Sequence, residues 1–345
     1  MIHDDSIDKE KKLFVSVVIV TFNRSSRIDP CLESLDCQTY PKDNFEVIVV
    51  DDGSTDDTAH SARNHEGVRV IRHEVNRGNP SARNTGLKAA RGEIIAYIDD
   101  DTVADPQWLE YLVQPFETPE VTASGGQTLA YKKDYITERY LSAVGYGNPA
   151  PLAFGKSKNP LWRFWIYLIN MFATSIPTKF TEVQAVYGCN CAYRTSVLRT
   201  IGGFDEDLLA NQDTEISTRL RQSGAHIIFA PNAIIHHRHR EKLAKLIRQT
   251  YRRAEYTRHY YAKENKILPL FPLPLFYIVI AVFLIIFQPI IGAIFIVFGP
   301  LVLYIWWPVR AFLDHNLEYF VYGYIQLTLE LASILGLVRG KFRSM

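Results

Sequence analysis

The sequence predicts an α/β fold built on a doubly wound sheet, followed by a hairpin of two transmembrane helices. Short β-branched runs alternate with helical stretches over the first hundred residues, and these runs are apolar on both faces, as in buried parallel strands. Residues 267–309 carry no charged side chain and are about twice the ~20 residues that one spanning helix needs.

The amino-terminal strands are expected at residues 15–20, 46–50, 68–71 and 94–98. Helices are expected between them, one containing Leu32 and Leu35 and another opening within residues 76–84. This alternation is typical of a doubly wound sheet. No Gly-x-Gly-x-x-Gly follows the first strand, which disfavours a dinucleotide-binding domain.

The composition excludes few classes of protein, but it limits the kinds of molecule that the chain is expected to bind. Lys+Arg 38 against Asp+Glu 37 in 345 residues gives a net charge of +1, so there is no overall attraction to nucleic acid. Four cysteines are too few and too irregularly spaced for a disulfide framework, and Cys189-x-Cys191 has no second pair with which to hold zinc. The first residues are acidic and polar, unlike a secretory signal peptide, so we expect a cytoplasmic catalytic part.

Three consecutive carboxylates, Asp99, Asp100 and Asp101, follow the apolar run at 94–98. The carboxyl ends of strands are where open α/β sheets bind ligands. Adjacent carboxylates repel one another and lose hydration on burial, so their gathering there indicates a divalent cation. The alternative is a solvated acidic turn.

Four motifs follow one another along the first hundred residues. They are Val-Val-Ile-Val-Thr-Phe-Asn-Arg, Val-Val-Asp-Asp-Gly-Ser-Thr-Asp, Asn-x-Gly-x-x-x-Ala-Arg-Asn-x-Gly and Ile-Asp-Asp-Asp. Their order and spacing resemble the family 2 glycosyltransferases, which have a GT-A fold with a mixed sheet. The resemblance implies a nucleotide-diphosphate-sugar donor and a divalent cation, Mg²⁺ or Mn²⁺.

The resemblance also implies roles for individual residues. The nucleotide-sugar would be bound by Thr21, Asn23, Arg24, Asp52, Arg83, Asp99 and Asp100. Within that set Asp52 would contact the base and Asp99 the ribose, while Asp99 and Asp101 would hold the metal on the diphosphate. Carboxylates suit a hard cation, which stabilises the charge that develops on a diphosphate leaving group. The alternative interpretation of Arg83 is that it is a surface residue of a helix.

The second half of the chain is expected to shape an acceptor site. Residues 121–126 are a candidate strand beside the metal, and Gly-Gly-Phe-Asp-Glu at 202–206 again resembles the family. The family usually has Glu-Asp further on, where this chain has Gln212-Asp213. An inverting transfer to a hydroxyl needs one carboxylate as general base, and Asp213 is our choice. The alternative role for Asp213 is a helix N-cap, and Gln212 removes a neighbouring charge.

A histidine-rich stretch ends the predicted catalytic domain, residues 13–240. Family members often place a further metal ligand about here, and His237 lies directly after an apolar run. Imidazole suits Mn²⁺ better than Mg²⁺. Contact with phosphate and exposure to solvent are the other interpretations of these histidines.

Two segments are candidates for the membrane surface. Residues 161–169 are apolar on most sides and form either a core helix or an interfacial helix. Residues 241–266 hold a basic amphipathic helix, which binds either a membrane surface or the domain itself. Arg253 follows Gln249-x-x-Arg252 where processive synthases of the family have tryptophan, so we do not expect a processive synthase.

The carboxyl end divides into residues 267–309, the predicted hairpin of two spans, and residues 310–345. Gln288-Pro289 separates the two arms of the hairpin, and both ends would lie on the cytoplasmic face. Residues 319–338 are apolar but contain Glu330 and precede three cations. A third span would place those cations outside, so we expect residues 310–345 to be interfacial or re-entrant.

These observations predict a membrane-anchored, metal-dependent inverting glycosyltransferase, with its catalytic domain on the cytoplasmic face of the cell membrane. It would move a sugar from a nucleotide-diphosphate-sugar to a hydroxyl of a lipid-linked or cell-surface glycan. A polyprenyl-phosphate glycosyltransferase is the nearest alternative, and a catalytically silent membrane scaffold is an alternative of another class.

Overall fold

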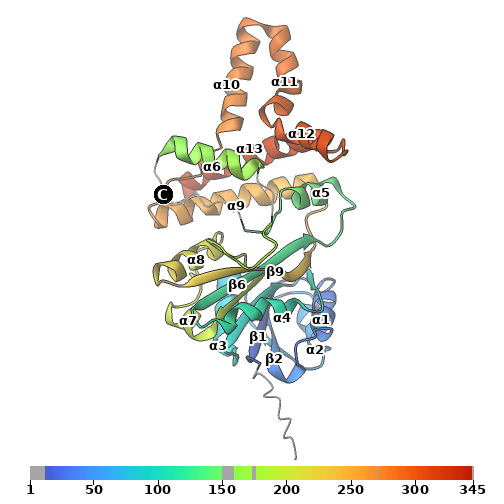
Figure 1. Ribbon diagram of the computed structural model, residues 1–345, viewed down its shortest axis with the longest axis vertical. Coiled ribbons are helices and arrows are strands. Elements are labelled where there is room, and N and C mark those ends of the chain that lie inside the picture. Colours follow the sequence, from blue (N-terminus) through green and yellow to red (C-terminus); the bar gives the residue numbers. More distant parts are fainter. Residues whose placement is uncertain (1–11, 150–158, 173–175, 270, 344–345) are drawn as a thin grey trace, which may run out of the picture.

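The computed structural model describes residues 12–149, 159–172, 176–269 and 271–343. The expectation about the acidic amino-terminal residues therefore lies outside the described part of the chain. A sheet domain forms one end of the molecule, a layer of helices covers it, and a pair of apolar helices projects from that layer (Figure 1).

The sheet has nine strands over the described residues, in the order β3-β2-β1-β4-β8-β6-β9-β5, with β7 beside β9. The strands are β1 (Val15–Thr21), β2 (Phe45–Asp51), β3 (Val68–Arg72), β4 (Ile94–Asp99), β5 (Thr102–Ala104), β6 (Val121–Ala130), β7 (Thr181–Glu182), β8 (Asn190–Arg194) and β9 (His226–His237). The four expected strands are confirmed as β1 to β4, which pair in parallel. β8 runs antiparallel to both β4 and β6, so the sheet is mixed, as the resemblance implied.

Helices cover both faces of the sheet, and the alternation of side chains along β1 decides which residues meet them. Val15, Val17 and Ile19 belong to a core with the helices α1 (Ile28–Asp36) and α4 (Trp108–Val113). Val18 points to the opposite core, which contains residues of α3 (Asn79–Ala89), α7 (Thr195–Thr200) and α8 (Gln212–Gln222). The short helix α2 (Thr58–Arg63) lies between β2 and β3 in the chain. Two-sided burial explains why these strands read as continuous apolar runs.

A layer of helices lies between the sheet domain and the projecting pair. It consists of α5 (Ile136–Ala143), α6 (Pro160–Phe172), α9 (Leu243–Lys263), α12 (Trp306–Leu313) and α13 (Tyr319–Arg343). Its core gathers Tyr140 of α5, Leu246 of α9, Trp307 of α12 and Tyr322 of α13. The layer is therefore packed by side chains from α5, α9, α12 and α13, rather than being a loose tail.

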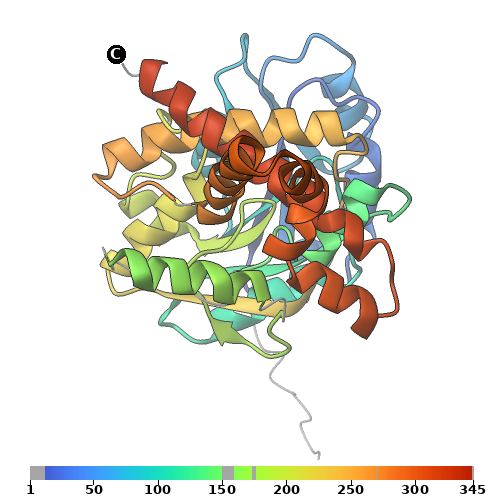
Figure 2. The ribbon, with the colours of Figure 1, turned by 90° about the horizontal axis from the view of Figure 1, so that it is seen from above.

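The projecting pair is a helical hairpin, α10 (Pro272–Phe287) and α11 (Pro289–Leu303), seen end-on near the middle of Figure 2. Its side chains are mostly apolar and exposed, with Ile286 and Val279 at 65% and Ile290 at 79%. Such a large exposed apolar surface is unusual on a protein surrounded by water.

The lengths of these helices differ from the prediction of two full spans. α10 has 16 residues and α11 has 15, so each arm is about 24 Å long or less, short of the ~30 Å hydrocarbon core. Among the described residues, the one straight helix long and apolar enough to cross a membrane is Tyr319–Gly340; α11 and α12 qualify as a pair bent by 64°.

The helix α13, despite its length, lies crosswise to the hairpin and beside α9 (Figure 1). A Cβ atom on Gly336 or Gly340 would overlap the backbone carbonyl oxygens of Tyr251 and Glu255 in α9. This close contact between helix backbones requires glycine, as in membrane helix pairs with small residues four apart. Packing against α9 holds α13 across the hairpin axis, and the interfacial or re-entrant placement of residues 310–345 stays a prediction.

Candidate active site

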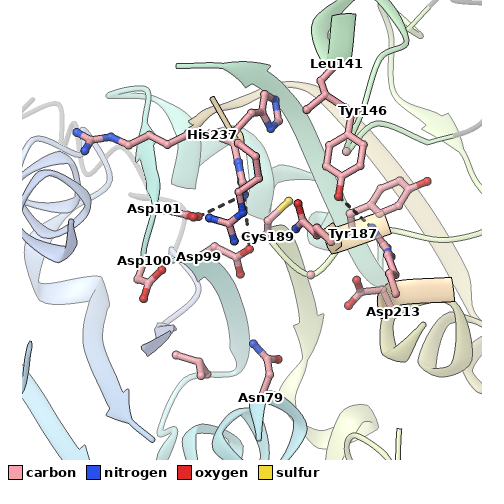
Figure 3. A pocket seen from close by; sticks show the side chains of 18 of the residues that line it. Asn79, Asp99, Asp100, Asp101, Leu141, Tyr146, Tyr187, Cys189, Asp213 and His237 are labelled. Carbon is pink, nitrogen blue, oxygen red and sulfur yellow. Dashed lines mark hydrogen bonds and ion pairs between the residues drawn. The ribbon is translucent and has the colours of Figure 1, made fainter. Parts of the chain in front are cut away.

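One large cavity, of about 780 Å³, opens at the carboxyl ends of β1 and β4. Its lining includes nine of the ten predicted site residues, namely Thr21, Arg24, Asp52, Arg83, Asp99, Asp100, Asp101, Asp213 and His237. Asn23 is not part of the lining. Asp100 and Asp213 lie on opposite sides of this cavity (Figure 3), so the residues come together from segments more than a hundred positions apart.

Asn23 has a different role in this structure. Its backbone is in the left-handed region, with φ 54°, and its side-chain oxygen accepts a hydrogen bond of 2.8 Å from the amide of Thr55. The Asn23 amide in turn donates to Ser54 Oγ at 2.9 Å. Asn23 therefore joins the loop after β1 to the loop after β2, and its predicted contact with the nucleotide stays a prediction.

Asp99, Asp101 and His237 form a cluster with the chemistry of a metal site. One ligand atom from each lies within 4.8 Å of the other two. Nε2 of His237 is 3.3 Å from an Asp101 oxygen and 3.9 Å from an Asp99 oxygen. Antiparallel pairing of β5 with β9 sets Thr102 opposite His237, which brings the histidine to the aspartates. Two carboxylates and an imidazole on one side of an open cavity fit a divalent cation.

Asp100, the middle carboxylate, points away from this cluster. It accepts a hydrogen bond of 2.7 Å from Thr21 Oγ1 and lies 3.8 Å from Nε of Arg24. Burial raises the pKa of the Asp100 carboxyl to about 7, with the neighbouring aspartates adding to the effect. Asp100 thus ties the end of β4 to the end of β1 instead of completing the metal cluster.

Asp52 is also engaged within the protein. One carboxylate oxygen contacts His73 Nδ1 at 2.7 Å and the amide of Arg77 at 2.9 Å, and the other accepts from the amide of Gly78 at 2.8 Å. These bonds hold the loop before α3 against the end of β2. Asp52 was predicted as a site residue from the sequence, whereas His73 was not. Their contact depends on the pairing of β2 with β3, which the sequence does not show directly.

Arg83 joins the metal cluster to the predicted base. Its Nη1 donates to Asp213 Oδ1 at 2.9 Å, and its Nη2 lies 3.8 Å from Asp99 Oδ1. The guanidinium is buried and stands over the rings of Tyr97 and Phe204, 5.7 and 5.3 Å from their centres. Arg83 is therefore a buried bridge, which contradicts its alternative interpretation as a surface residue.

Asp213 lies in the first turn of α8, one residue after the helix begins. Asn211, with φ 61°, occupies the N-cap position, so the capping role considered for Asp213 is not the one it has. The positive end of the helix dipole favours a carboxylate there. The Gln212 side chain turns back and donates to the carbonyl of Leu208 at 2.8 Å, so Asp213, and not Gln212, lines the cavity.

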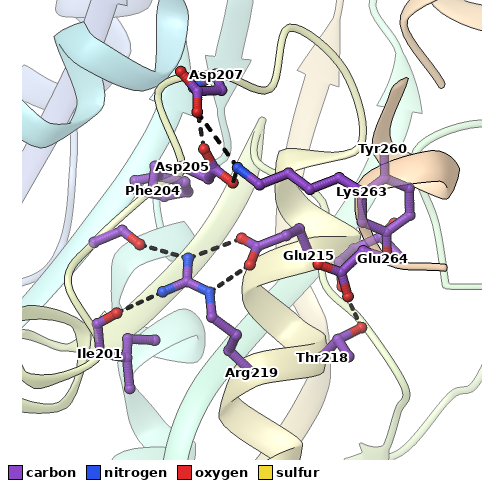
Figure 4. A network of polar contacts seen from close by, with 12 residues as sticks. Ile201, Phe204, Asp205, Asp207, Glu215, Thr218, Arg219, Tyr260, Lys263 and Glu264 are labelled. Atoms are coloured by element: carbon purple, nitrogen blue, oxygen red, sulfur yellow. Dashed lines mark hydrogen bonds and ion pairs between the residues drawn. The ribbon is translucent and has the colours of Figure 1, made fainter. Parts of the chain in front are cut away.

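A polar network fixes the loop that precedes α8 (Figure 4). Arg219 of α8 donates to the carbonyl of Gly203 at 2.6 Å and to Glu215 at 2.8 Å. Lys263, at the end of α9, is paired with Asp205 and lies 3.5 Å from Asp207. The network connects α9 to the loop and thereby positions the start of α8, where Asp213 lies.

Two further residues of the cavity were not predicted. Gly188 lies against the Arg83–Asp213 pair, and a Cβ atom there would overlap both side chains. Arg253, which the sequence marked only as a departure from tryptophan, lines the cavity and donates to the hydroxyl of Tyr146 at 3.0 Å. The position of Arg253 four residues after Gln249 was the available signal, since both lie on one helix face.

Comparisons with known proteins identify the family and the fold. Residues 16–202 match the model of glycosyl transferase family 2, and residues 162–312 match that of glycosyl transferase family group 2. The first match covers more than half of the chain. The chain belongs to glycosyl transferase family 2. It has the GT-A fold.

Two curated relatives show how far the likeness extends. Glycosyltransferase AglE of Haloferax volcanii is 29% identical over 227 residues, which are 64% of this chain and 66% of that protein, a little under two thirds. A Methanococcus voltae enzyme named dolichyl N-acetyl-alpha-D-glucosaminyl phosphate 3-beta-D-2,3-diacetamido-2,3-dideoxy-beta-D-glucuronosyltransferase is 26% identical over 248 residues, 69% of this chain and 70% of that protein.

Among solved structures, the mannosyltransferase PcManGT from Pyrobaculum calidifontis, in complex with GDP-Man and Mn²⁺, superposes with a TM-score of 0.58. The superposition covers 95% of this chain and 88% of that one at 20% identity, a level that establishes the fold alone.

Proposed function

We propose that this family 2 enzyme is a metal-dependent inverting glycosyltransferase that works at a membrane surface. It transfers a sugar from a nucleotide-diphosphate-sugar to a hydroxyl group of a lipid-linked or glycan acceptor. The observation that carries the proposal is the shared cavity, with Asp99, Asp101 and His237 on one side, Asp213 on another, and Arg83 in contact with both sets.

The donor side of the cavity fits a diphosphate and its cation. Asp99, Asp101 and His237 are the residues that would hold Mg²⁺ or Mn²⁺, and the imidazole favours Mn²⁺. When bound, the cation supplies charge stabilisation to the departing diphosphate. Arg24, whose Nε lies near Asp100, offers a further positive group at the nucleotide end of the cavity.

On the acceptor side, Asp213 has the position of a general base. Its carboxylate takes the proton of the acceptor hydroxyl as the acceptor oxygen bonds to the anomeric carbon of the sugar. The bond from that carbon to the diphosphate breaks, and its electron pair leaves on the nucleoside diphosphate. Arg83 orients the carboxylate through the 2.9 Å bond before the acceptor arrives.

The membrane part of the proposal rests on the apolar hairpin and on the layer beneath it. The exposed arms α10 and α11 insert into the bilayer as a re-entrant hairpin, while α6 and α13 lie along its surface. Trp162 and Trp165 of α6 are 49% and 56% exposed, and tryptophan prefers the headgroup region. The exposed tryptophans support the interfacial interpretation of residues 161–169. A membrane surface along α6 would lie close to the cavity, and the cytoplasmic side is part of our proposal.

A donor screen tests the proposal directly. The purified full-length protein is incubated with a panel of nucleotide sugars and Mn²⁺, and release of nucleoside diphosphate is measured with and without chelator. We expect slow, metal-dependent hydrolysis of one or a few donors. Equal release in excess chelator, or none from any donor with either metal, would contradict the proposal.

A polyprenyl-phosphate acceptor remains the second candidate, because α9 presents several cations to the cavities. In that case the attacking atom is a phosphate oxygen, which needs no strong base. Asp213→Asn separates the two candidates. Transfer to a hydroxyl acceptor should be lost in this variant, whereas transfer to a phosphate oxygen should be retained.

A further inference from the structure

His73 is a buried titratable residue that the proposed mechanism does not use. It follows β3 directly and is 8% exposed. Parallel pairing sets Arg72 opposite Asp51, and the amide of His73 donates to the carbonyl of Asp51 at 2.9 Å. The next residues along the two strands, His73 and Asp52, are therefore placed side by side by the pairing of the two backbones.

Both ring nitrogens of His73 have partners inside the protein. Nδ1 lies 2.7 Å from Asp52 Oδ1, and Nε2 lies 2.9 Å from Thr85 Oγ1 in α3. The same carboxylate accepts from the amides of Arg77 and Gly78, at 2.9 and 2.8 Å. An ionised carboxylate only accepts hydrogen bonds, so Nδ1 carries the proton that lies between His73 and Asp52.

Thr85 holds the imidazole ring from its other side. The Thr85 hydroxyl also lies 3.1 Å from the carbonyl of Ser81, one turn earlier in α3. A hydrogen bond at one ring nitrogen of a histidine fixes the orientation of the ring and the role of the other nitrogen. The ring of His73 is therefore held with Nδ1–H directed at Asp52.

Asp52 stands between His73 and the active-site cavity. It lines the cavity although it is only 2% exposed, whereas His73 is not among the described residues that line it. Within the described part of the chain, Oδ1 of Asp52 accepts two hydrogen bonds and Oδ2 accepts one, which leaves an acceptor position on Oδ2. Such a small exposed area suits a single contact with a ligand.

The backbone around Asp52 is held by contacts that do not involve the imidazole. Gly53 has φ 79°, and a Cβ atom there would lie 2.6 Å from the carbonyl carbon of Val75. The loop between β3 and α3 is thus packed closely on the turn after β2, and the amides of Arg77 and Gly78 bind Asp52 as well. Loss of the imidazole bond would therefore turn the carboxylate rather than move the loop.

We propose that His73 is a positioning residue for recognition of the nucleobase of the donor. Its Nδ1–H holds Oδ1 of Asp52, so that Oδ2 keeps its open position for a ring N–H of the base. Uracil, thymine and guanine carry such a ring N–H, whereas the corresponding ring nitrogens of cytosine and adenine are acceptors. A site that accepts from an N–H discriminates strongly against a base that lacks it. The inference rests on the proposed function, since it names the nucleotide class of the same donor.

Selectivity among nucleoside diphosphates is the first test. Binding of UDP, dTDP, GDP, ADP and CDP to the full-length protein is measured by calorimetry with Mn²⁺ present. We expect at least one of UDP, dTDP and GDP to bind ten times more tightly than both ADP and CDP. Tightest binding of ADP or CDP, or equal affinity for all five, overturns the proposal.

Two variants separate the two contacts of His73. His73→Asn keeps an N–H near the position of Nδ1, whereas the longer side chain of His73→Gln reaches toward Thr85 and withdraws that N–H from Asp52. We expect the preferred nucleotide to bind within threefold of wild type in His73→Asn and at least tenfold more weakly in His73→Gln. Equal affinities in the two variants overturn the proposal. The control is His65→Gln, which removes a contact of 3.3 Å with Asp29 away from the cavity and should change the affinity less than twofold.

Donor hydrolysis distinguishes positioning from a merely structural role. With Mn²⁺, we expect His73→Gln to raise the KM for the donor at least tenfold and to keep the rate at saturating donor within threefold, because Asp52 would contact the base and not the reacting bond. A rate that stays low at saturating donor would show that His73 supports the fold and would overturn the proposal.

The same measurements separate this inference from the proposed function. If the wild-type protein binds nucleotides with the expected selectivity and dependence on His73 but hydrolyses no donor, the inference stands and the proposed function falls. If it hydrolyses a donor in a metal-dependent way and His73→Gln keeps the wild-type affinity, the inference falls alone. If the wild-type protein binds none of the five nucleotides, both fall.

Discussion

Arg83 and Asp213 are 130 positions apart in the chain, yet Nη1 of the arginine lies 2.9 Å from Oδ1 of the aspartate. The arginine is buried under Tyr97 and Phe204, whereas the aspartate is partly open to the cavity. Because the other guanidinium nitrogen faces Asp99 at 3.8 Å, a change in this pair affects both the base and the metal cluster. The pair therefore couples the acceptor side of the site to its donor side.

Gly188→Ala should impair catalysis by displacing the pair. The new Cβ atom would overlap both guanidinium nitrogens of Arg83 and the bonded oxygen of Asp213, and the buried arginine has little room to move. We expect transfer to fall by about tenfold or more, with a smaller change in donor affinity. In an Arg83→Ala background the same substitution should have little further effect, because contacting residues are not additive. Additive losses in the double variant would show that Gly188 acts independently of the pair.

Asp101→Asn should weaken metal binding. It removes a charged ligand from the cluster with Asp99 and His237 but keeps the size of the side chain. We expect Mn²⁺ affinity, measured by electron paramagnetic resonance, to fall tenfold or more and transfer to be nearly abolished. Asp105→Asn is the control, since Asp105 is a nearby, partly exposed aspartate that pairs with His236 at 2.9 Å and does not line the cavity. Equal Mn²⁺ affinity in the two variants would remove Asp101 from the metal site.

Asp213→Asn should separate proton transfer from donor binding. The amide keeps the shape of the side chain but cannot accept the acceptor proton, so we expect transfer to fall by ~10² or more. Donor affinity, measured by calorimetry, should stay within a few-fold because the metal cluster is untouched. Near-normal turnover would place the base elsewhere. Asp205 and Glu206 are then next, although Lys263 and Asn84 already engage them.

Phe287→Asp together with Ile290→Asp should release the protein from membranes. Both side chains lie at the tip of the hairpin, are 64% and 79% exposed, and are far from the active-site cavity. Burying two charges in hydrocarbon costs several kcal/mol, so we expect most of the variant to leave the membrane fraction after a salt wash. Donor hydrolysis should be unchanged, which serves as the control for folding. Retention through salt and alkaline washes would show that the hairpin is not the principal anchor.

The local elements and the chemistry of the site were predictable from the sequence because both depend on short segments. The β-branched runs that became β1 to β4 are buried on two faces, and the carboxylates after β4 lie at a strand end, which directs them to the ligand side of the sheet. The motif resemblance then assigned Asp99, Asp101, Asp213 and His237 to functions, and the structure gathers all four around one cavity.

Side-chain partners and helix orientation were decided only by the tertiary structure, because they depend on residues distant in the chain. Arg83 reads as an exposed helix residue until α8 brings Asp213 against it. Composition describes residues 319–340 as a possible span, but the contact of Gly336 and Gly340 with the α9 backbone turns the helix across the hairpin. Apolar periodicity reports which face of a helix is buried, and it does not report whether protein or lipid covers that face.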